Sequence, residues 1–459
     1  MINFAFDKVI TYGENEGIIV PYPNFYSEEL YGFDMNKYQE KYGTFPIKDV
    51  DMDEEDKLFL NGRSICFNLN GDLCPINQNT VDHFINKNES FLYTLLIWNN
   101  DLFDKPIDLE IPEKVKYQII SGKCKIVIFY ITEPWFMYQH CYEWLSDFSF
   151  RNNLTKDDMI FVSSNLISPE VKNRYVNEGI IKNNFTIIPF NYFFHRLWFF
   201  KKKFHESSSE EVYNNILRDN LHKLRTIKKD KHFLCFNRKP HDHRVAIYAE
   251  VMTNEKLKDK TIITLGRENI IGGQIYKEAI RRFIDSTYKF GHERLHNFID
   301  SIDPTIDYLY DTESMDPEQS ININLDVHHS TFCNIVTETL TAEDLIFFSE
   351  KIIKPIFSLQ PFVLIGNRGS LKKLKEYGFK TFDKWWDESY DDEYHQKRFE
   401  RIVVLLEEIS QWDEEKISRT IVEMEEVLIH NFKMLLVDES TKAFLKHIMR
   451  IYKNKTLIG

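Results

Sequence analysis

A glutamate–lysine pair, Glu350-Lys351, stands at the predicted start of a helix over residues 350–359. The first turn of a helix leaves main-chain N–H groups free to bind a phosphate. The Lys351 ammonium adds a charge suited to a diphosphate, and the Glu350 carboxylate can accept hydrogen bonds from ribose hydroxyls. The strand expected next ends at Gly366, at the edge where doubly wound sheets bind ligands. A first-turn glutamate beside a solvated lysine is the alternative interpretation.

A second polar group, the segment NRKPHDHR at 237–244, lies between a predicted strand and a predicted helix. It contains Asn237, Arg238, His243 and Arg244. Because arginine suits bidentate contacts with phosphate oxygens, we expect this segment to contribute to an anion site. A basic, exposed turn with ordinary helix capping is the alternative. No nearby carboxylate or cysteine completes a ligand set with the histidines, so no metal site is predicted.

A third signal is the segment TEPW, in which Glu133 and Trp135 directly follow the strongest predicted strand of the first half. A carboxylate at the carboxyl end of such a strand faces the ligand-binding side of the fold. Beside apolar Trp135, we expect its pKa to rise toward the range of a general base. An ordinary loop carboxylate is the alternative.

The run FNYFFHRLWFFKKKF, at 190–204, interleaves aromatic residues with His195, Arg196 and a lysine triplet that begins at Lys201. Aromatic side chains can stack on sugars or bases, and lysines can follow phosphates. With Trp135, this run is the candidate acceptor-binding region. A buried strand that leads into a basic linker is the alternative.

Strands and helices are expected to alternate along most of the chain. Continuous apolar runs predict strands at 124–131, 159–163, 185–189, 232–237, 261–265, 334–337 and 361–366. Helices are predicted over 243–254 and 350–359. This rhythm indicates an α/β fold with a mostly parallel, doubly wound sheet. The first 115 residues mix short apolar runs with acidic loops and predict no definite element.

The length of 459 residues predicts two domains. Composition changes near residues 205–230, which places an N-terminal, acceptor-side domain at 1–228 and a donor-binding, Rossmann-like domain at 229–392. Amphipathic helices that pack on the domains are predicted over 393–459. Their apolar stripe consists of Phe399, Ile402, Leu406 and Ile409.

The net charge of −13 argues against a general nucleic-acid coat, although a local basic groove remains compatible with it. The six cysteines form no CxxC pair, which favours a reducing cytoplasm. No signal peptide and no apolar stretch of ~20 residues is found, so no membrane span is expected. The Asp-x-Asp letters in DMDEED, at 51–56, lie in a charge run typical of a solvated face.

Together these segments resemble the α1,3-fucosyltransferase family and the phage and giant-virus glycosyltransferases akin to it. In that family an acceptor-domain strand ends in a turn that carries the general base, and Glu133 stands at that place. The donor domain opens with a strand that ends in Ser-Asn and is followed by an arginine. Asn237 and Arg244 match these positions, and Gly266 ends the next strand.

The family's hallmark is an acidic strand end followed by Thr-Glu-Lys, which Glu338 and then Ser349-Glu350-Lys351 match at similar spacing. The chain departs from the pattern because TET lacks the asparagine of the motif and SEK replaces TEK. The acceptor turn EPW also lacks a serine. The segment GFKTFDKWWDESY, at 378–390, is not a fucosyltransferase feature and is similar to the viral relatives.

The resemblance implies a GT-B fold, in which two Rossmann-like domains face a cleft. It implies inverting transfer of a sugar from a nucleotide-diphosphate sugar, with no metal and no resident cofactor. Glu133 would deprotonate the acceptor hydroxyl, Arg244 and Lys351 would neutralise the diphosphate, and Glu350 would hold the ribose.

The acceptor remains open between a glycan and a hydroxymethylated base of phage DNA, which base flipping would expose. The expected location is the cytoplasm, or the host cytoplasm for a viral protein. A different class also stays open: a non-catalytic sugar-binding or virion-associated protein on a degenerate glycosyltransferase scaffold. The missing asparagine after Glu338 favours that alternative.

Overall fold

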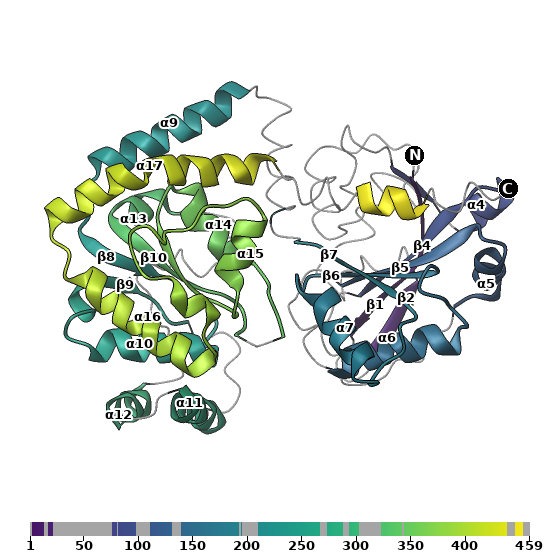
Figure 1. The fold of residues 1–459 in the computed structure, drawn as a ribbon, viewed down its shortest axis with the longest axis horizontal. Coiled ribbons are helices and arrows are strands. Elements are labelled where there is room, and N and C mark those ends of the chain that lie inside the picture. The colour runs from purple at the N-terminus through teal and green to yellow at the C-terminus, as the bar shows by residue number, and fades with distance from the viewer. Residues whose placement is uncertain are drawn as a thin grey trace, which may run out of the picture. The chain divides into compact units, whose positions relative to one another are not determined.

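The computed structural model divides into two compact units, which are described separately. Unit 1 comprises Met1–Arg196 and Glu439–Gly459, and unit 2 comprises Leu197–Asp438. The described residues are 2–12, 17–21, 76–79, 81–97, 111–130, 139–191, 194, 210–266, 273–287, 293–302, 323–341, 344–437 and 446–452. Both units combine largely parallel strands with helices, which confirms the α/β class (Figure 1).

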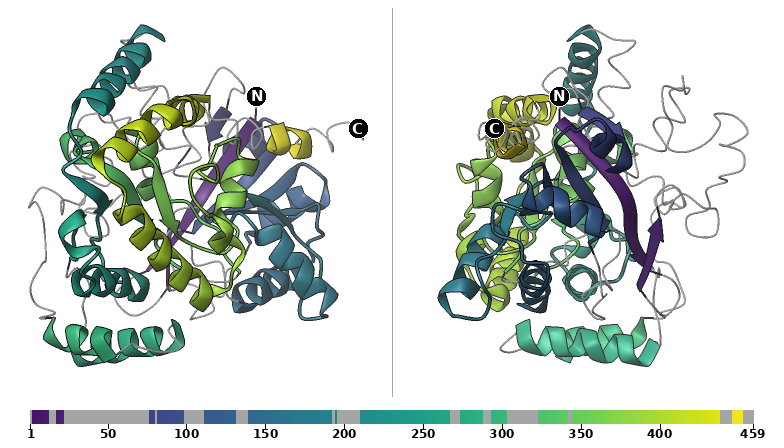
Figure 2. Two further views of the ribbon diagram at one scale, coloured as in Figure 1. Left: turned by 60° about the vertical axis from the view of Figure 1, so that its left-hand side comes forward. Right: turned by 90° about the vertical axis from the view of Figure 1, so that its right-hand side faces the viewer.

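Unit 1 contains a seven-stranded sheet, in which β1 pairs antiparallel with β2 and the other pairings are parallel. β1 is the long curved strand drawn in purple in Figure 2. The strands are β1 (Ile2–Tyr12), β2 (Gly17–Pro21), β3 (Ile76–Asn79), β4 (Phe91–Ile97), β5 (Cys124–Tyr130), β6 (Met159–Ser163) and β7 (Thr186–Pro189). The predicted strands at 124–131, 159–163 and 185–189 are therefore confirmed.

The core of unit 1 lies where its helices cover one face of this sheet. The helices are α4 (Val81–Asn86), α5 (Glu113–Ile120), α6 (Gln139–Arg151) and α7 (Ser168–Asn177). β4 to β7 follow one another across the sheet in chain order, so right-handed crossovers place α5, α6 and α7 on the same side. Ile126 and Ile128 of β5 belong to this core, and Val127 and Phe129 are equally buried on the opposite face.

Unit 2 contains a four-stranded parallel sheet with the order β11-β10-β8-β9. The strands are β8 (Lys231–Cys235), β9 (Thr261–Ile263), β10 (Thr331–Thr337) and β11 (Phe362–Ile365). The chain moves from β8 outward to β9, returns to β10 on the other side of β8, and continues to β11. The neighbours β8 and β10 therefore form the switch point of a doubly wound sheet, as the sequence pattern predicts.

Helices cover both faces of the sheet in unit 2. α10 (Asp242–Thr253) contacts α11 (Gly273–Thr287) and α12 (Glu293–Ser301). α14 (Glu350–Phe357) contacts α17 (Glu414–Val437), which also lies beside α9 (Glu210–Thr226) in Figure 1. The helices predicted at 243–254 and 350–359 are confirmed within two residues at either end.

The carboxyl-terminal helices bury the predicted apolar stripe. In α16 (His395–Ser410), the four stripe residues are at most 3% exposed. α16 and α17 belong to unit 2, whereas the helical residues 446–452 belong to unit 1, where the Tyr452 hydroxyl donates to the Ser90 carbonyl at 2.7 Å. The predicted boundary at residue 228 lies inside unit 2, between α9 and β8.

The segment 378–390 contributes an aromatic cluster to the core of unit 2. The Phe382 ring meets the Phe362 ring of β11 edge-on, with centroids 5.1 Å apart. The ring centroid of Trp386 lies 5.2 Å from that of Phe382, and the ring centroid of Trp412 lies 6.5 Å from that of Trp386. The structure therefore gives this segment a packing role. Among the described residues, no helix combines the length and apolar character that crossing a membrane requires.

A buried polar network fixes the amino end of β10. Nδ1 of His328, in α13 (Leu325–His329), bonds Oε1 of Gln360 at 2.8 Å. Nε2 of Gln360 donates to Oγ1 of Thr331 at 2.7 Å. Burial lowers the pKa of His328 to about 4, and the bond to Gln360 opposes this shift. The folded protein therefore keeps this imidazole neutral.

This depressed pKa predicts acid sensitivity. The unfolded chain takes up the His328 proton near pH 6.5, whereas the folded chain resists protonation until about pH 4. The neutral His328 side chain thus makes its full contribution to the free energy of unfolding above pH 6.5. This contribution is lost as the pH falls toward 4, at about 1.4 kcal/mol per pH unit. His328→Asn keeps an N–H donor without the titration, so its free energy of unfolding should fall less steeply over this range. Urea unfolding at several pH values measures how the free energy of unfolding depends on pH in the wild type and in His328→Asn. The same dependence in both proteins would show that His328 does not cause the acid sensitivity.

Candidate functional site

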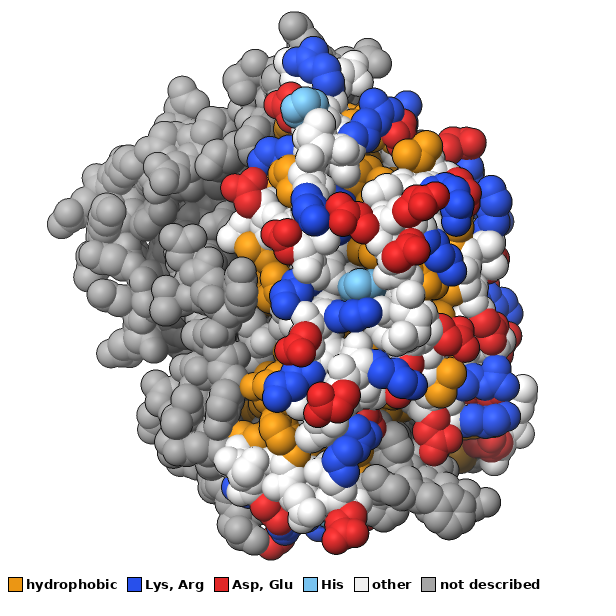
Figure 3. All heavy atoms as spheres, turned by 90° about the vertical axis from the view of Figure 1, so that its left-hand side faces the viewer, with side chains coloured by type: hydrophobic (Ala, Val, Ile, Leu, Met, Phe, Trp, Pro, Cys, Tyr) orange, Lys and Arg blue, Asp and Glu red, His pale blue; other side chains and the backbone are white. Residues whose placement is uncertain are grey.

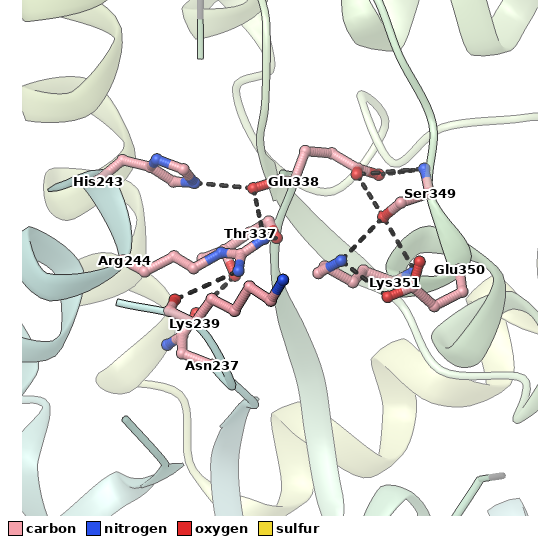
Figure 4. A network of polar contacts seen from close by, with 9 residues as sticks. All are labelled: Asn237, Lys239, His243, Arg244, Thr337, Glu338, Ser349, Glu350 and Lys351. Carbon is pink, nitrogen blue, oxygen red and sulfur yellow. Dashed lines mark hydrogen bonds and ion pairs between the residues drawn. The ribbon is translucent and has the colours of Figure 1, made fainter. Parts of the chain in front are cut away.

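The candidate site lies at the carboxyl ends of β8 and β10, at the switch point of the sheet in unit 2 (Figure 4). The loop at 236–241 joins β8 to α10, and the segment at 338–349 joins β10 to α14. Doubly wound sheets bind ligands outside the carboxyl ends of the strands that flank such a point. The two segments that the sequence singled out, 237–244 and 338–351, therefore meet at one edge.

Asn237 connects the ends of three strands. Its Oδ1 accepts a hydrogen bond from the Thr337 hydroxyl of β10 at 2.6 Å, and its Nδ2 donates to Sγ of Cys235 at 3.3 Å. Its main-chain N–H donates to Oγ1 of Thr264, and its carbonyl accepts from the N–H of Gly266, which follows β9. Asn237 is 1% exposed. In the structure Asn237 and Gly266 thus shape the site, with their polar groups directed into the protein.

Arg244, in the first turn of α10, is buried and bonds main-chain carbonyls. Its Nη2 donates to the carbonyls of Thr337 at 3.3 Å and Glu338 at 2.9 Å, and its Nη1 donates to the Lys239 carbonyl at 3.3 Å. Nε finds no acceptor among the described residues. Burial lowers the pKa of Arg244 to about 10, against the opposing charges of Glu350 and Glu338. Arg244 therefore remains cationic and ties the β8–α10 loop to the end of β10.

Two histidines flank this arginine. Nε2 of His243 bonds the Glu338 carbonyl at 2.8 Å, and the His243 ring stacks on that of His241 with centroids 6.1 Å apart. Burial, together with the charges of Arg244, Lys351 and Lys239, lowers the pKa of His241 to about 3. His241 is therefore neutral at physiological pH. Lys239 and Lys351 come from different segments, and the charges of both lower the pKa of His241.

Glu338 and Ser349 close the amino end of α14. The Glu338 carboxylate accepts the Ser349 hydroxyl at 2.6 Å and the Ser349 N–H at 3.2 Å. Ser349 is the N-cap, and its Oγ accepts the Lys351 N–H at 3.3 Å. Burial raises the pKa of Glu338, while the Lys351 charge and the bonds from Ser349 oppose the rise. Glu338 thus holds the helix start, where the sequence led us to expect N–H groups available to a phosphate.

Glu350 and Lys351 form an ion pair at the start of α14. Nζ of Lys351 lies 2.8 Å from Oε1 of Glu350 and 3.3 Å from Oγ of Ser349, and both charged side chains are about one-quarter exposed. Burial opposes ionisation of Glu350, but the Lys351 charge and the Glu350 N–H outweigh it and lower its pKa. Glu350 is therefore an ionised carboxylate with exposed surface, which suits hydroxyl recognition.

Positive charge predominates in the site. Electrostatic interactions among the described residues bring five basic side chains together around His241, Lys354 and the carboxylates of Glu338 and Glu350. The five are Arg238, Lys239, Arg244, Lys351 and Lys354. Burial lowers the pKa of Lys354, and the charges of Lys351 and Arg238 lower it further against the attraction of Glu350. The excess is three positive charges when both carboxylates are ionised.

Lys239 and Lys354 are site residues that the sequence interpretation missed. Lys239 lies inside NRKPHDHR, but arginine was preferred there as the phosphate ligand. Lys354 follows Glu350 by four residues, a spacing that places both on the same face of a helix. That spacing is the feature of the sequence from which Lys354 could have been predicted as a site residue.

The predicted site residues of the first half fall outside the described residues. These are Glu133, Trp135, His195, Arg196 and Lys201. The described residues contain no group of three or more histidine, cysteine or acidic side chains placed to hold a metal ion. The site described above therefore consists of residues of unit 2 alone.

Replacement of Arg244 by lysine tests its observed role. Lysine keeps a positive charge but cannot bond the same three carbonyls with a planar fork. We expect Arg244→Lys to lower the free energy of unfolding by about 2–3 kcal/mol, because buried carbonyls lose their donors. Arg419→Lys, at an exposed position of α17, is the matched control and should change it by less than about 0.5 kcal/mol. Denaturant unfolding measures both, and equal values would refute the role.

Comparison with known proteins adds no family assignment: no protein-family model and no curated protein sequence matches the chain.

Proposed function

We propose that the chain is a metal-independent glycosyltransferase, which moves a sugar from a nucleotide-diphosphate sugar to a hydroxyl acceptor with inversion. The observation that supports this most is the cationic excess at the switch point of a doubly wound sheet. Ligands of such folds bind at this edge, and an excess of positive charge selects an anionic one.

The chemistry of the site suits a nucleoside diphosphate as leaving group. When the bond from the sugar to the diphosphate breaks, negative charge develops on the diphosphate oxygen. Basic side chains that are already in place stabilise this charge electrostatically, as a metal ion does in other enzymes. Lys351 provides such a charge, and its side chain is about one-quarter exposed beside Glu350. The ionised Glu350 carboxylate is suited to accept hydrogen bonds from the ribose hydroxyls.

The proposal includes a GT-B arrangement, with unit 2 on the donor side and unit 1 on the acceptor side. The α/β architecture of each unit supports it, because a GT-B enzyme needs two such domains. Glu133, the proposed general base, comes shortly after Tyr130, the last residue of β5, in the sequence. Its carboxylate would take the proton of the acceptor hydroxyl as that oxygen attacks the anomeric carbon.

A glycan acceptor is favoured over duplex DNA. On the face of unit 2 that Figure 3 shows, the described basic and acidic side chains are interspersed and form no continuous basic stripe, so this face of the proposed donor-side unit offers no track for a DNA backbone. The net charge of −13 also disfavours binding to the DNA backbone. Protein binding to a DNA backbone depends on grouped positive charge and weakens steeply with salt. Salt-dependent affinity for duplex DNA would therefore point to the modified-base acceptor instead.

Thermal-shift measurements with nucleoside diphosphates and nucleotide sugars test the donor site. We expect one nucleotide base to raise the unfolding midpoint, with or without EDTA, since a ligand that binds the folded state stabilises it. Lys351→Ala should abolish most of the shift, and Lys258→Ala, on the exposed turn before β9, should preserve it. If the wild-type protein shows no shift with any nucleotide, the glycosyltransferase proposal fails and a degenerate scaffold becomes the better description.

Glu133→Gln tests the proposed base separately from donor binding. The amide has nearly the same shape as the carboxylate but cannot accept the proton. We expect turnover to fall at least about a hundredfold, the usual minimum contribution of general-base catalysis. The nucleotide-induced thermal shift should be unchanged. Turnover at the wild-type rate would show that another group acts as the base.

A further inference from the structure

The most obvious anion ligands of the site already bind protein groups. Arg244 directs its terminal nitrogens to three main-chain carbonyls. The N–H groups of Ser349 and Lys351, at the start of α14, are taken by Glu338 and by the Ser349 hydroxyl. Lys351 itself is paired with Glu350. A phosphate that bound the two N–H groups of α14 would have to displace existing bonds. Lys351 keeps a third N–H beside its bonds to Glu350 and Ser349, whereas the remaining donor nitrogen of Arg244, Nε, is buried.

Lys239 differs from these residues because its ammonium group has no acceptor among the described residues. In Figure 4 its side chain extends from the β8–α10 loop toward the side on which Lys351 lies. Both lysines act electrostatically on His241, so the two charges, although separate in sequence, share one neighbourhood. The side chain is partly exposed and therefore accessible to a ligand.

The main chain of Lys239 is held firmly, while its ammonium group bonds none of the described residues. Its carbonyl accepts the Arg244 guanidinium at 3.3 Å and the His241 N–H at 3.0 Å. Pro240 follows directly and fixes its own backbone angle φ. An anchored backbone reduces the entropy that a lysine loses when its ammonium engages a ligand. Lys239 is thus prepared for contact with an anion.

We propose that Lys239, and not Arg244, binds the diphosphate directly alongside Lys351, and that Lys239 makes the site prefer a nucleoside diphosphate to the corresponding monophosphate. This inference rests on the proposed donor site. Arg244 then acts as a positioning residue, which holds the carbonyl of Lys239 and supplies long-range positive charge. The diphosphate carries one negative charge more than the monophosphate, and Lys239 provides the unpaired cation that matches it.

Calorimetric titration of the full chain with a nucleoside diphosphate, the matching monophosphate and inorganic pyrophosphate tests this proposal. We expect Lys239→Gln to weaken diphosphate binding about ten- to a hundredfold, the effect of one lost charge-assisted hydrogen bond. Monophosphate binding should weaken much less, so that the preference for the diphosphate largely disappears. Lys239→Arg should recover most of the affinity, and the midpoint of thermal unfolding without ligand should stay unchanged.

Lys258→Gln is the matched control, because it removes the same charge at the amino edge of the same sheet. It should leave both affinities within about twofold of the wild type, an effect well below one charge-assisted bond. Diphosphate binding by Lys239→Gln at wild-type strength would overturn the assignment of Lys239 while leaving the proposed function intact. Binding of pyrophosphate through Lys239 without binding of any nucleoside diphosphate would instead reject the proposed function and keep Lys239 as an anion ligand.

Discussion

The contact between the Arg244 guanidinium and the main chain organises the site of unit 2. One buried cation bonds the carbonyls of Thr337 and Glu338 at the end of β10 and the carbonyl of Lys239 in the β8–α10 loop. A buried charge is tolerated only when its surroundings provide well-placed polar partners. Here those partners belong to the segments that carry the candidate-site residues. The carbonyls that bond the buried Arg244 therefore also fix the shape of the candidate site.

The rest of the site accumulates charge that a folded protein normally avoids. Lys354 and Lys351 lie near Arg238, and together with Arg244 they outnumber the two carboxylates. Mutual repulsion of this kind lowers stability unless an anion relieves it. The aromatic cluster around Phe382 and the network around His328 stabilise other parts of the same unit. Repulsion between like charges is typical of functional sites, where it lowers the stability of the fold but favours the binding of a ligand of opposite charge.

Much of the fold could be predicted because parallel strands buried on both faces are continuous apolar runs. β5 and β6 are of this kind, and both were located within one residue. β1 was missed because Asp7 and Lys8 interrupt its apolar pattern, close to the irregular pairing with β4. Helix starts such as that of α14 were predictable, since an N-cap serine and a first-turn glutamate are local signals.

The roles within the site depended on distant contacts and could not be predicted in this way. Arg244 was recognised as important, but its partner Thr337 is 93 residues away, and only the folded chain shows that its terminal nitrogens bond main-chain carbonyls. The sequence likewise could not show that Glu338 would occupy the start of α14. Lys239 was passed over because residue type alone ranks arginine above lysine as a phosphate ligand. Which cation stays unbound is decided by the packing of neighbouring segments.

The unbound ammonium of Lys239 also has an evolutionary consequence. Asn237 and Arg244 hold the main chain together, so selection for folding alone would preserve them even in a relative without the proposed activity. The side chain of Lys239 bonds no other group among the described residues, and its carbonyl would be present in any residue type, so a lineage without a ligand would let this position drift. Among related chains, the residue at this position would therefore distinguish working enzymes from inactive scaffolds better than the more prominent arginine does.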